Sequence, residues 1–214
     1  MTPIDVIFPE SARRYVDLQC NGDVSQFTSP DCYSAIREFI GLEQPRTCLE
    51  LGCGLGRMSV FFLKKLNWHG TKFYLLDGDS GTVQISGVRG NRCGEFYNSL
   101  QATRDFCQQN GMLHPQVIRE VSQIEQSIDM CYSFLSIGWH WSIELYLDSI
   151  LDHLAEDSLV IFQIRNLGDT GMDHFREQQI QLARQHSAYH LQALILNSSK
   201  RVGSFLVLRK VLSS

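Results

Sequence analysis

The chain lacks the features that would place it in a membrane, outside the cell or on a nucleic acid. No apolar run approaches the ~20 residues of a membrane-spanning helix, and the first residues show no signal-peptide progression of basic, apolar and small residues. The 19 Lys and Arg residues are outweighed by 23 Asp and Glu, and they are scattered rather than clustered. Because nucleic-acid binding needs a basic patch, we expect neither a nucleic-acid nor a membrane partner, and a cytoplasmic location.

Cysteine usage excludes two further classes of protein. The seven cysteines are an odd number, none forms a Cys-x-x-Cys pair, and none groups with histidine at the spacing of metal ligands. A disulfide framework or a zinc module would show one of these patterns. We therefore expect reduced thiols in the cytosol and no metal site.

The chain does contain enough apolar residues for one substantial core, since 43% of its 214 residues are hydrophobic. Short apolar runs alternate with helical patterns, as in a doubly wound α/β fold. The expected strands are 48–51, 72–77, 116–119, 128–132, 159–164, 191–196 and 202–211. The expected helices are 29–40, 57–66, 97–109, 143–154 and 172–185.

The last two apolar runs identify the end of the sheet. Only residues 197–201 separate them, which is too short for a crossover helix, so the two strands must pair as an antiparallel hairpin. The predicted fold is a Rossmann-like, seven-stranded α/β sheet, mostly parallel with a C-terminal antiparallel hairpin and with helices on both faces. Residues 1–45 are expected to form an N-terminal cap segment with a helix, and residues 46–214 the main domain.

A glycine motif follows the first expected strand. Glu50 is followed by Gly52, Gly54 and Gly56, and an amphipathic segment comes next. A strand that ends in a glycine-rich turn and opens a helix is typical of cofactor sites in open α/β sheets. A dinucleotide fingerprint would need its third glycine where Arg57 stands, and Glu50 would repel a pyrophosphate. The motif therefore favours a positively charged nucleoside.

A second acid ends the next expected strand. Asp77 lies about twenty residues beyond the last motif glycine, the distance that a strand-helix-strand unit requires. A carboxylate at this point accepts hydrogen bonds from ribose hydroxyls. Asp79 is a nearby alternative in the same Asp-Gly-Asp-Ser turn.

The motif from Glu50 to Gly56 resembles the first motif of the class I S-adenosylmethionine-dependent methyltransferases: acid, any, Gly, any, Gly, any, Gly. The resemblance covers about residues 46–211 and implies that fold, S-adenosylmethionine as cofactor and methyl transfer as activity. Glu50, or a water that it orients, would accept from the cofactor's ammonium group. The expected cofactor-binding residues are Glu50, Gly52, Cys53, Gly54, Asp77, Gly78 and Ser133. Cys53 is more simply explained as filler within the motif.

In this family the residues after the fourth strand border the reacting methyl group. Here that stretch runs from Ser133 to Trp141 and contains a histidine between two tryptophans. His140 is the candidate base, because histidine removes a hydroxyl proton near neutral pH. Trp139 and Trp141 are expected to contact the cation or an acceptor ring. Alternatively, the tryptophans are core anchors and His140 is merely exposed between them.

Other features bear on the acceptor. Arg165, after the expected fifth strand, is a further candidate for substrate binding, and the glycine-rich segment 78–94 is a candidate lid. The Asp/Asn-Pro-Pro-aromatic sequence of amino-methylating DNA enzymes is absent from the chain. Glu120 and Ser122 are both imperfect fits for the family's adenine contact.

The scattered basic residues and the stretch after the fourth expected strand favour a small-molecule acceptor. The stretch from Ser133 to His140 loosely resembles small bacterial sugar O-methyltransferases, so a hydroxyl oxygen of a sugar-like or other polar metabolite is the expected acceptor. The alternatives are a methyltransferase for protein or nucleic acid, which would need a groove and a basic surface, and a catalytically degenerate binding module.

Overall fold

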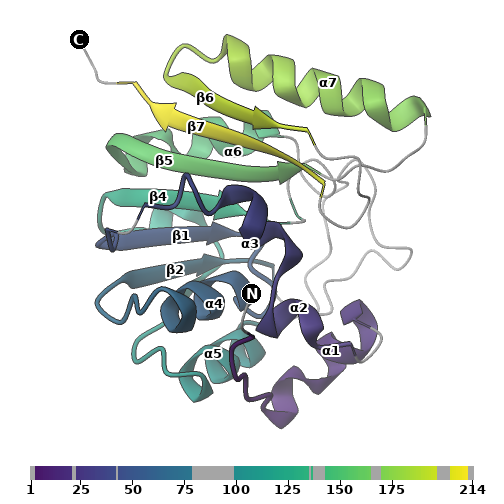
Figure 1. The fold of residues 1–214 in the computed structure, drawn as a ribbon. Coiled ribbons are helices and arrows are strands. Elements are labelled where there is room, and N and C mark those ends of the chain that lie inside the picture. Colours follow the sequence, from purple (N-terminus) through teal and green to yellow (C-terminus); the bar gives the residue numbers. More distant parts are fainter. Residues whose placement is uncertain are drawn as a thin grey trace.

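The fold was taken from a computed structural model, which describes residues 3–20, 23–41, 43–78, 99–134, 136, 143–164, 170–196 and 203–211 (Figure 1). Ten helical segments and seven strands are assigned within these ranges. The strands form one mixed sheet between two helical layers.

The sheet has the predicted mixed topology. Its strands are β1 (Thr47–Leu51), β2 (Lys72–Leu76), β3 (Gln116–Ile118), β4 (Ile128–Ser133), β5 (Leu154–Ile164), β6 (Tyr189–Ile195) and β7 (Ser204–Lys210). Their spatial order is β3-β2-β1-β4-β5-β7-β6. The first five strands are parallel, whereas β7 runs antiparallel to both β5 and β6. The expected seven-stranded sheet with a C-terminal hairpin is thus confirmed.

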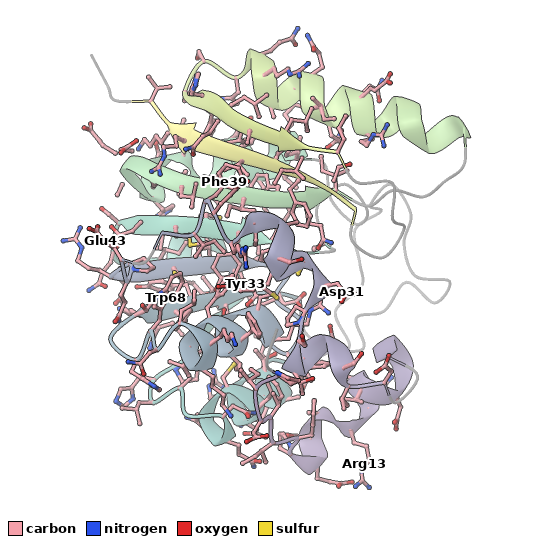
Figure 2. The ribbon with its side chains drawn as sticks, in the orientation of Figure 1. Arg13, Asp31, Tyr33, Phe39, Glu43 and Trp68 are labelled. Atoms are coloured by element: carbon pink, nitrogen blue, oxygen red, sulfur yellow. The ribbon has the colours of Figure 1, made fainter. Side chains whose placement is uncertain are left out.

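Helices cover both faces of the sheet. They are η1 (Glu10–Ala12), α1 (Arg13–Cys20), α2 (Ser25–Thr28), α3 (Asp31–Ile36), α4 (Arg57–Lys65), α5 (Leu100–Gln109), η2 (Val121–Gln123), α6 (Ile143–Ile150), η3 (Leu151–His153) and α7 (Thr170–Gln185). The segments from α3 to α5 and the N-terminal residues form one core with the sheet, and α6 and α7 form the other. On the first face, Tyr33 of α3 packs its ring edge against Phe61 of α4 (Figure 2).

Several element boundaries differ from those expected. The helix expected from residue 97 begins at Leu100, because the Ser99 hydroxyl accepts from the Ala102 amide at 3.0 Å and caps the helix there. The helix expected to continue to residue 154 ends at Ile150. Leu154 instead opens β5 by pairing with Ile128, which sets the strand's start earlier than the apolar run indicated.

The helix expected over 29–40 is also shorter. Helix α3 begins at Asp31, with Pro30 as an N-cap that makes no side-chain capping bond, and it ends at Ile36. Phe39 and Ile40 follow in a turn that still packs into the first core. The expected apolar contacts therefore persist although the helical geometry does not.

Residues 4–12, here named the N-terminal strap, are fixed to α4 and α5. The side chain of Asn110 accepts from the Ile7 amide at 2.8 Å and donates to the Ile7 carbonyl at 2.7 Å. It therefore pairs with the strap as a neighbouring strand would. Lys64 adds contacts to the Asp5 carbonyl at 2.6 Å and to Asn110 Oδ1 at 3.0 Å. Asn110 is only 2% exposed, and its bonds to Ile7 and Lys64 are partly buried.

We expect Asn110→Ala to lower the free energy of unfolding by about 2–3 kcal/mol, because it leaves both polar groups of Ile7 and the Lys64 ammonium without this partner. Urea unfolding measures the change. Gln108→Ala is the matched control on α5, since Gln108 is exposed; it is expected to change stability by less than about 0.5 kcal/mol. Equal effects of the two changes would contradict this account of the strap.

Candidate functional site

The glycine motif forms a left-handed turn between β1 and α4. Gly52, Gly54 and Gly56 have φ values of +63°, +55° and +76°, which only glycine adopts without strain. Each glycine also has a neighbour where a side chain would start. A Cβ would overlap the hydroxyl of Ser136 at Gly52 and that of Tyr15 at Gly54, and at Gly56 it would lie 2.9 Å from the thiol of Cys107. The motif therefore needs glycine for both conformation and space.

Hydrogen bonds to the middle glycine hold this turn in place. The amide of Gly54 donates to Asp77 Oδ2 at 2.5 Å, and its carbonyl accepts from the Thr103 hydroxyl at 2.7 Å. The Cys53 amide also donates to the Leu76 carbonyl at 3.1 Å. The turn is thus tied to the end of β2 and to α5, and its shape is fixed before any ligand binds.

Asp77 lies at the carboxyl end of β2, beside the end of β1. Its Oδ1 accepts from the Gly78 amide at 2.7 Å, so both carboxylate oxygens are bound by backbone. Burial raises the pKa of Asp77 to about 6, although the bonds from Gly54 and Gly78 oppose this rise. A cation placed here would lower that pKa again, because it favours the charged form.

Glu50 is buried within β1, with 3% of its surface exposed. Its Oε2 accepts from the Ser59 amide at 3.1 Å and from the Ser59 hydroxyl at 2.6 Å, and that hydroxyl lies 2.7 Å from the phenol oxygen of Tyr132. Ser59 is the third residue of α4, whose N-cap, Gly56, has no side chain to offer. Glu50 therefore caps α4 from the neighbouring strand. Its expected contact with a cofactor ammonium stays a prediction.

The charge state of Glu50 depends on its environment. Burial raises its pKa to about 7, while the bonds from Ser59 and the charge of Arg57 oppose the rise, and nearby Asp77 adds to it. The two acids thus lie near one another at the carboxyl ends of adjacent strands, and both titrate closer to neutrality than ordinary carboxyls.

Two serines after β4 lie against the start of the glycine turn. Ser133 is fully buried, and its hydroxyl donates to the Leu51 carbonyl at 2.8 Å, so it ties β4 to β1. Ser136 lies over Gly52 and shares a hydrogen bond with Tyr146 of α6. Burial raises the pKa of Tyr146 well above its ordinary value, although the bond with Ser136 opposes the rise, so the phenol stays protonated.

Three of these neighbours, Thr103, Tyr146 and Tyr15, are not predicted from the sequence. Such residues reach the turn only through tertiary contacts, since Thr103 is 49 positions from the glycine that it bonds. The carboxyl-end position of Ser136 after a central strand is the one clue that sequence offers.

Several predicted site residues lie outside the described part of the chain. They are Trp139, His140, Trp141 and Arg165, together with Asp79 and most of the 78–94 segment. Their roles stay predictions.

The remaining candidates can be located. Glu120 caps η2 and accepts from the Ser122 hydroxyl at 3.3 Å, and both are exposed. Cys53 is a buried, free thiol, and burial raises its pKa well above the ordinary value. These properties fit a packing role within the motif rather than a chemical one.

Among the described residues, no helix combines the length and the apolar character that a membrane span needs. No group of three or more His, Cys, Asp or Glu side chains among the same residues could hold a metal ion.

Comparison with known proteins shows the fold. No family model matches the chain, and no curated protein matches its sequence. Solved structures do match. The O-methyltransferase TomG from Streptomyces achromogenes, involved in tomaymycin synthesis and crystallised with S-adenosylmethionine, is 13% identical with a TM-score of 0.61, over 97% of this chain and 92% of that one. The O-methyltransferase from Bacillus cereus, in complex with S-adenosylhomocysteine, is 11% identical with a TM-score of 0.59, over 97% and 93%.

A methyltransferase with a different kind of acceptor has a similar fold. The B. subtilis tRNA methyltransferase TrmK is 12% identical with a TM-score of 0.54, over 86% of this chain and 66% of that one. At such identities the likeness concerns architecture rather than substrate. The chain therefore has the class I S-adenosylmethionine-dependent methyltransferase fold, as its glycine motif predicted.

We expect Glu50→Gln to remove part of the pH dependence of stability. The folded protein holds the Glu50 proton up to about pH 7, whereas an ordinary glutamate has a pKa of 4.5. The stability contributed by protonated Glu50 is therefore complete below pH 4.5 and is lost as the pH rises to about 7. Glutamine can still accept from Ser59 but carries no charge. Over this pH window the free energy of unfolding of the variant should therefore rise by roughly 2–3 kcal/mol relative to that of the wild type.

Urea unfolding between pH 4.5 and pH 8 measures this difference. Glu43→Gln, at an exposed position away from the site, is the matched control and should follow the wild type. Parallel curves for wild type and Glu50→Gln would contradict the raised pKa.

Proposed function

We propose that this protein is an S-adenosylmethionine-dependent methyltransferase that transfers a methyl group to a hydroxyl oxygen of a small, polar, sugar-like acceptor. The observation that carries the proposal is the bond from Gly54 to Asp77, with Glu50 nearby. It joins the glycine turn to a carboxylate at the end of β2, and the charge of Asp77 also acts on the buried carboxyl of Glu50. S-adenosylmethionine has a sulfonium and an ammonium against one carboxylate, so these acidic surroundings favour it over a dinucleotide.

The groups on the turn suit the polar parts of this cofactor. Gly52 and Gly54 have no Cβ, and the atoms nearest to where a Cβ would lie are the hydroxyl oxygens of Ser136 and Tyr15. Hydroxyls can donate to a carboxylate or exchange hydrogen bonds with ribose. Asp77 is the candidate acceptor for the ribose hydroxyls, as its position after β2 predicts. Both matched O-methyltransferases were crystallised with S-adenosyl ligands, which supports the same cofactor here.

For transfer, the chain must align the acceptor and remove its proton. The bound cofactor supplies a methyl group on a sulfonium, which is already a good leaving group. His140 is the proposed base, because it follows β4, where the end of that strand meets the glycine turn through Ser133. Trp139, Trp141 and Arg165 are proposed to hold the acceptor. Alignment of the acceptor oxygen with the methyl carbon supplies the rest of the rate enhancement.

A small acceptor is favoured over a nucleic acid. TrmK has the same fold and acts on tRNA, so the fold itself allows either. This chain, however, carries a net charge of −4 and scattered basic residues, whereas tRNA binding relies on a concentrated positive surface.

We expect Asp77→Asn to weaken S-adenosylmethionine binding by at least about 10-fold, because asparagine has one acceptor oxygen and no charge. Isothermal titration with S-adenosylmethionine, S-adenosylhomocysteine and NAD measures the affinities. Asp31→Asn, at an exposed position at the start of α3, is the matched control and should bind as the wild type does. Thermal unfolding without ligand separates a lost contact from a disturbed turn. Binding of NAD alone would overturn the proposed function.

His140→Ala is expected to lower methyl transfer by about 100-fold or more while leaving cofactor affinity within about 2-fold, because a general base acts only on the acceptor proton. Release of S-adenosylhomocysteine, measured with a panel of sugars and other polar alcohols, reports the rate. Full turnover by the variant would show that another group removes the proton.

A further inference from the structure

A tyrosine from the N-terminal part of the chain lies on the glycine turn. Tyr15 belongs to α1, and its hydroxyl approaches Gly54 so closely that any side chain there would overlap it. Helix α1 lies near the end of the sheet to which the parallel strands point (Figure 1). A polar group from outside the sheet therefore reaches the middle of the motif that holds the cofactor.

Helix α5 fixes the spacing between Tyr15 and this turn, because it binds both partners. Thr103 of α5 holds the carbonyl of Gly54 at 2.7 Å. The same helix also holds the strap that leads to α1. Asp105 accepts from the Ser11 hydroxyl at 2.7 Å, and Asn110, the C-cap residue of α5, bonds both backbone groups of Ile7. The N-terminal strap and the glycine turn are thus both held by α5.

Apolar packing secures the strap as well. The ring of Phe8 lies 5.0 Å from that of Phe27 and 5.4 Å from that of Phe106 on α5. Ala12 is fully buried and Val16 nearly so, which turns one side of α1 toward the core. Tyr15 itself is half-buried and packs against the same core.

We propose that Tyr15 is a cofactor-binding residue and that the N-terminal strap is part of the cofactor site. Its hydroxyl would hydrogen-bond an oxygen of the bound S-adenosyl group, a carboxylate or a ribose hydroxyl, at the face of Gly54. This inference rests on the proposed function and adds to it a residue outside the glycine motif. The opposite role, a plug that competes with the cofactor, predicts the opposite change in affinity.

The test is the affinity of Tyr15→Phe for S-adenosylhomocysteine and S-adenosylmethionine, measured by isothermal titration. Loss of one hydrogen bond should weaken binding about 5-fold, and Tyr15→Ala should weaken it further. Tyr33→Phe is the matched control, because Tyr33 lies on the neighbouring α3 and packs against Phe61 instead (Figure 2). It should bind within about 2-fold of the wild type. Unfolding temperatures without ligand should agree among the two Phe variants and the wild type.

Hydrogen exchange of the wild-type protein gives a second measurement that needs no variant. Saturating S-adenosylhomocysteine should slow exchange in residues 13–20 as well as in the turn 52–56. Protection of the turn alone, or unchanged or tighter binding by Tyr15→Phe, would overturn the role of Tyr15 and leave the proposed function standing. If the wild type binds neither S-adenosyl ligand, the proposed function fails, and this inference fails with it.

Discussion

The hydrogen bond from Gly54 to the Asp77 carboxylate is the constraint on which the site depends. It closes the turn after β1 onto the end of β2, and it can form only because the two strands are adjacent and parallel. The bare backbone of three left-handed glycines lets the chain turn sharply enough to reach the carboxylate. Thr103 of α5 then holds the carbonyl of the same glycine. A loop of glycines, which would otherwise be the most pliable part of the chain, is held on both sides.

Burial of two acids at this point has an electrostatic consequence. Desolvation raises the pKa of Glu50 and of Asp77 toward neutrality, so in the free protein their negative charge is costly. A ligand that brings positive charge to the same place relieves that cost, whereas an anionic ligand adds to it. The proposed preference for a cationic nucleoside therefore rests on the buried carboxylates and not on the glycines, which many phosphate-binding turns share.

The sequence was informative where signals are local. Apolar runs located the seven strands, the five-residue connection predicted the hairpin, and the spacing to Asp77 identified the second acid correctly at the end of β2. The contacts that complete the site come from residues far apart in the chain. Asn110 bonds a residue 103 positions away, and nothing in the N-terminal segment indicates that Tyr15 reaches the turn. Helix ends were misjudged where a cap or a strand pairing, rather than the apolar pattern, decides the boundary, as at Ser99 and Leu154.

Glu50 shows how one residue of a motif can serve two purposes. Its carboxylate closes the first turn of α4, because glycine occupies the position from which a helix is normally capped. Folding alone is thus a sufficient reason for a hydrogen-bond acceptor at this place, which glutamine would also supply. An acceptor at this position of the strand is therefore evidence of the architecture before it is evidence of an enzyme.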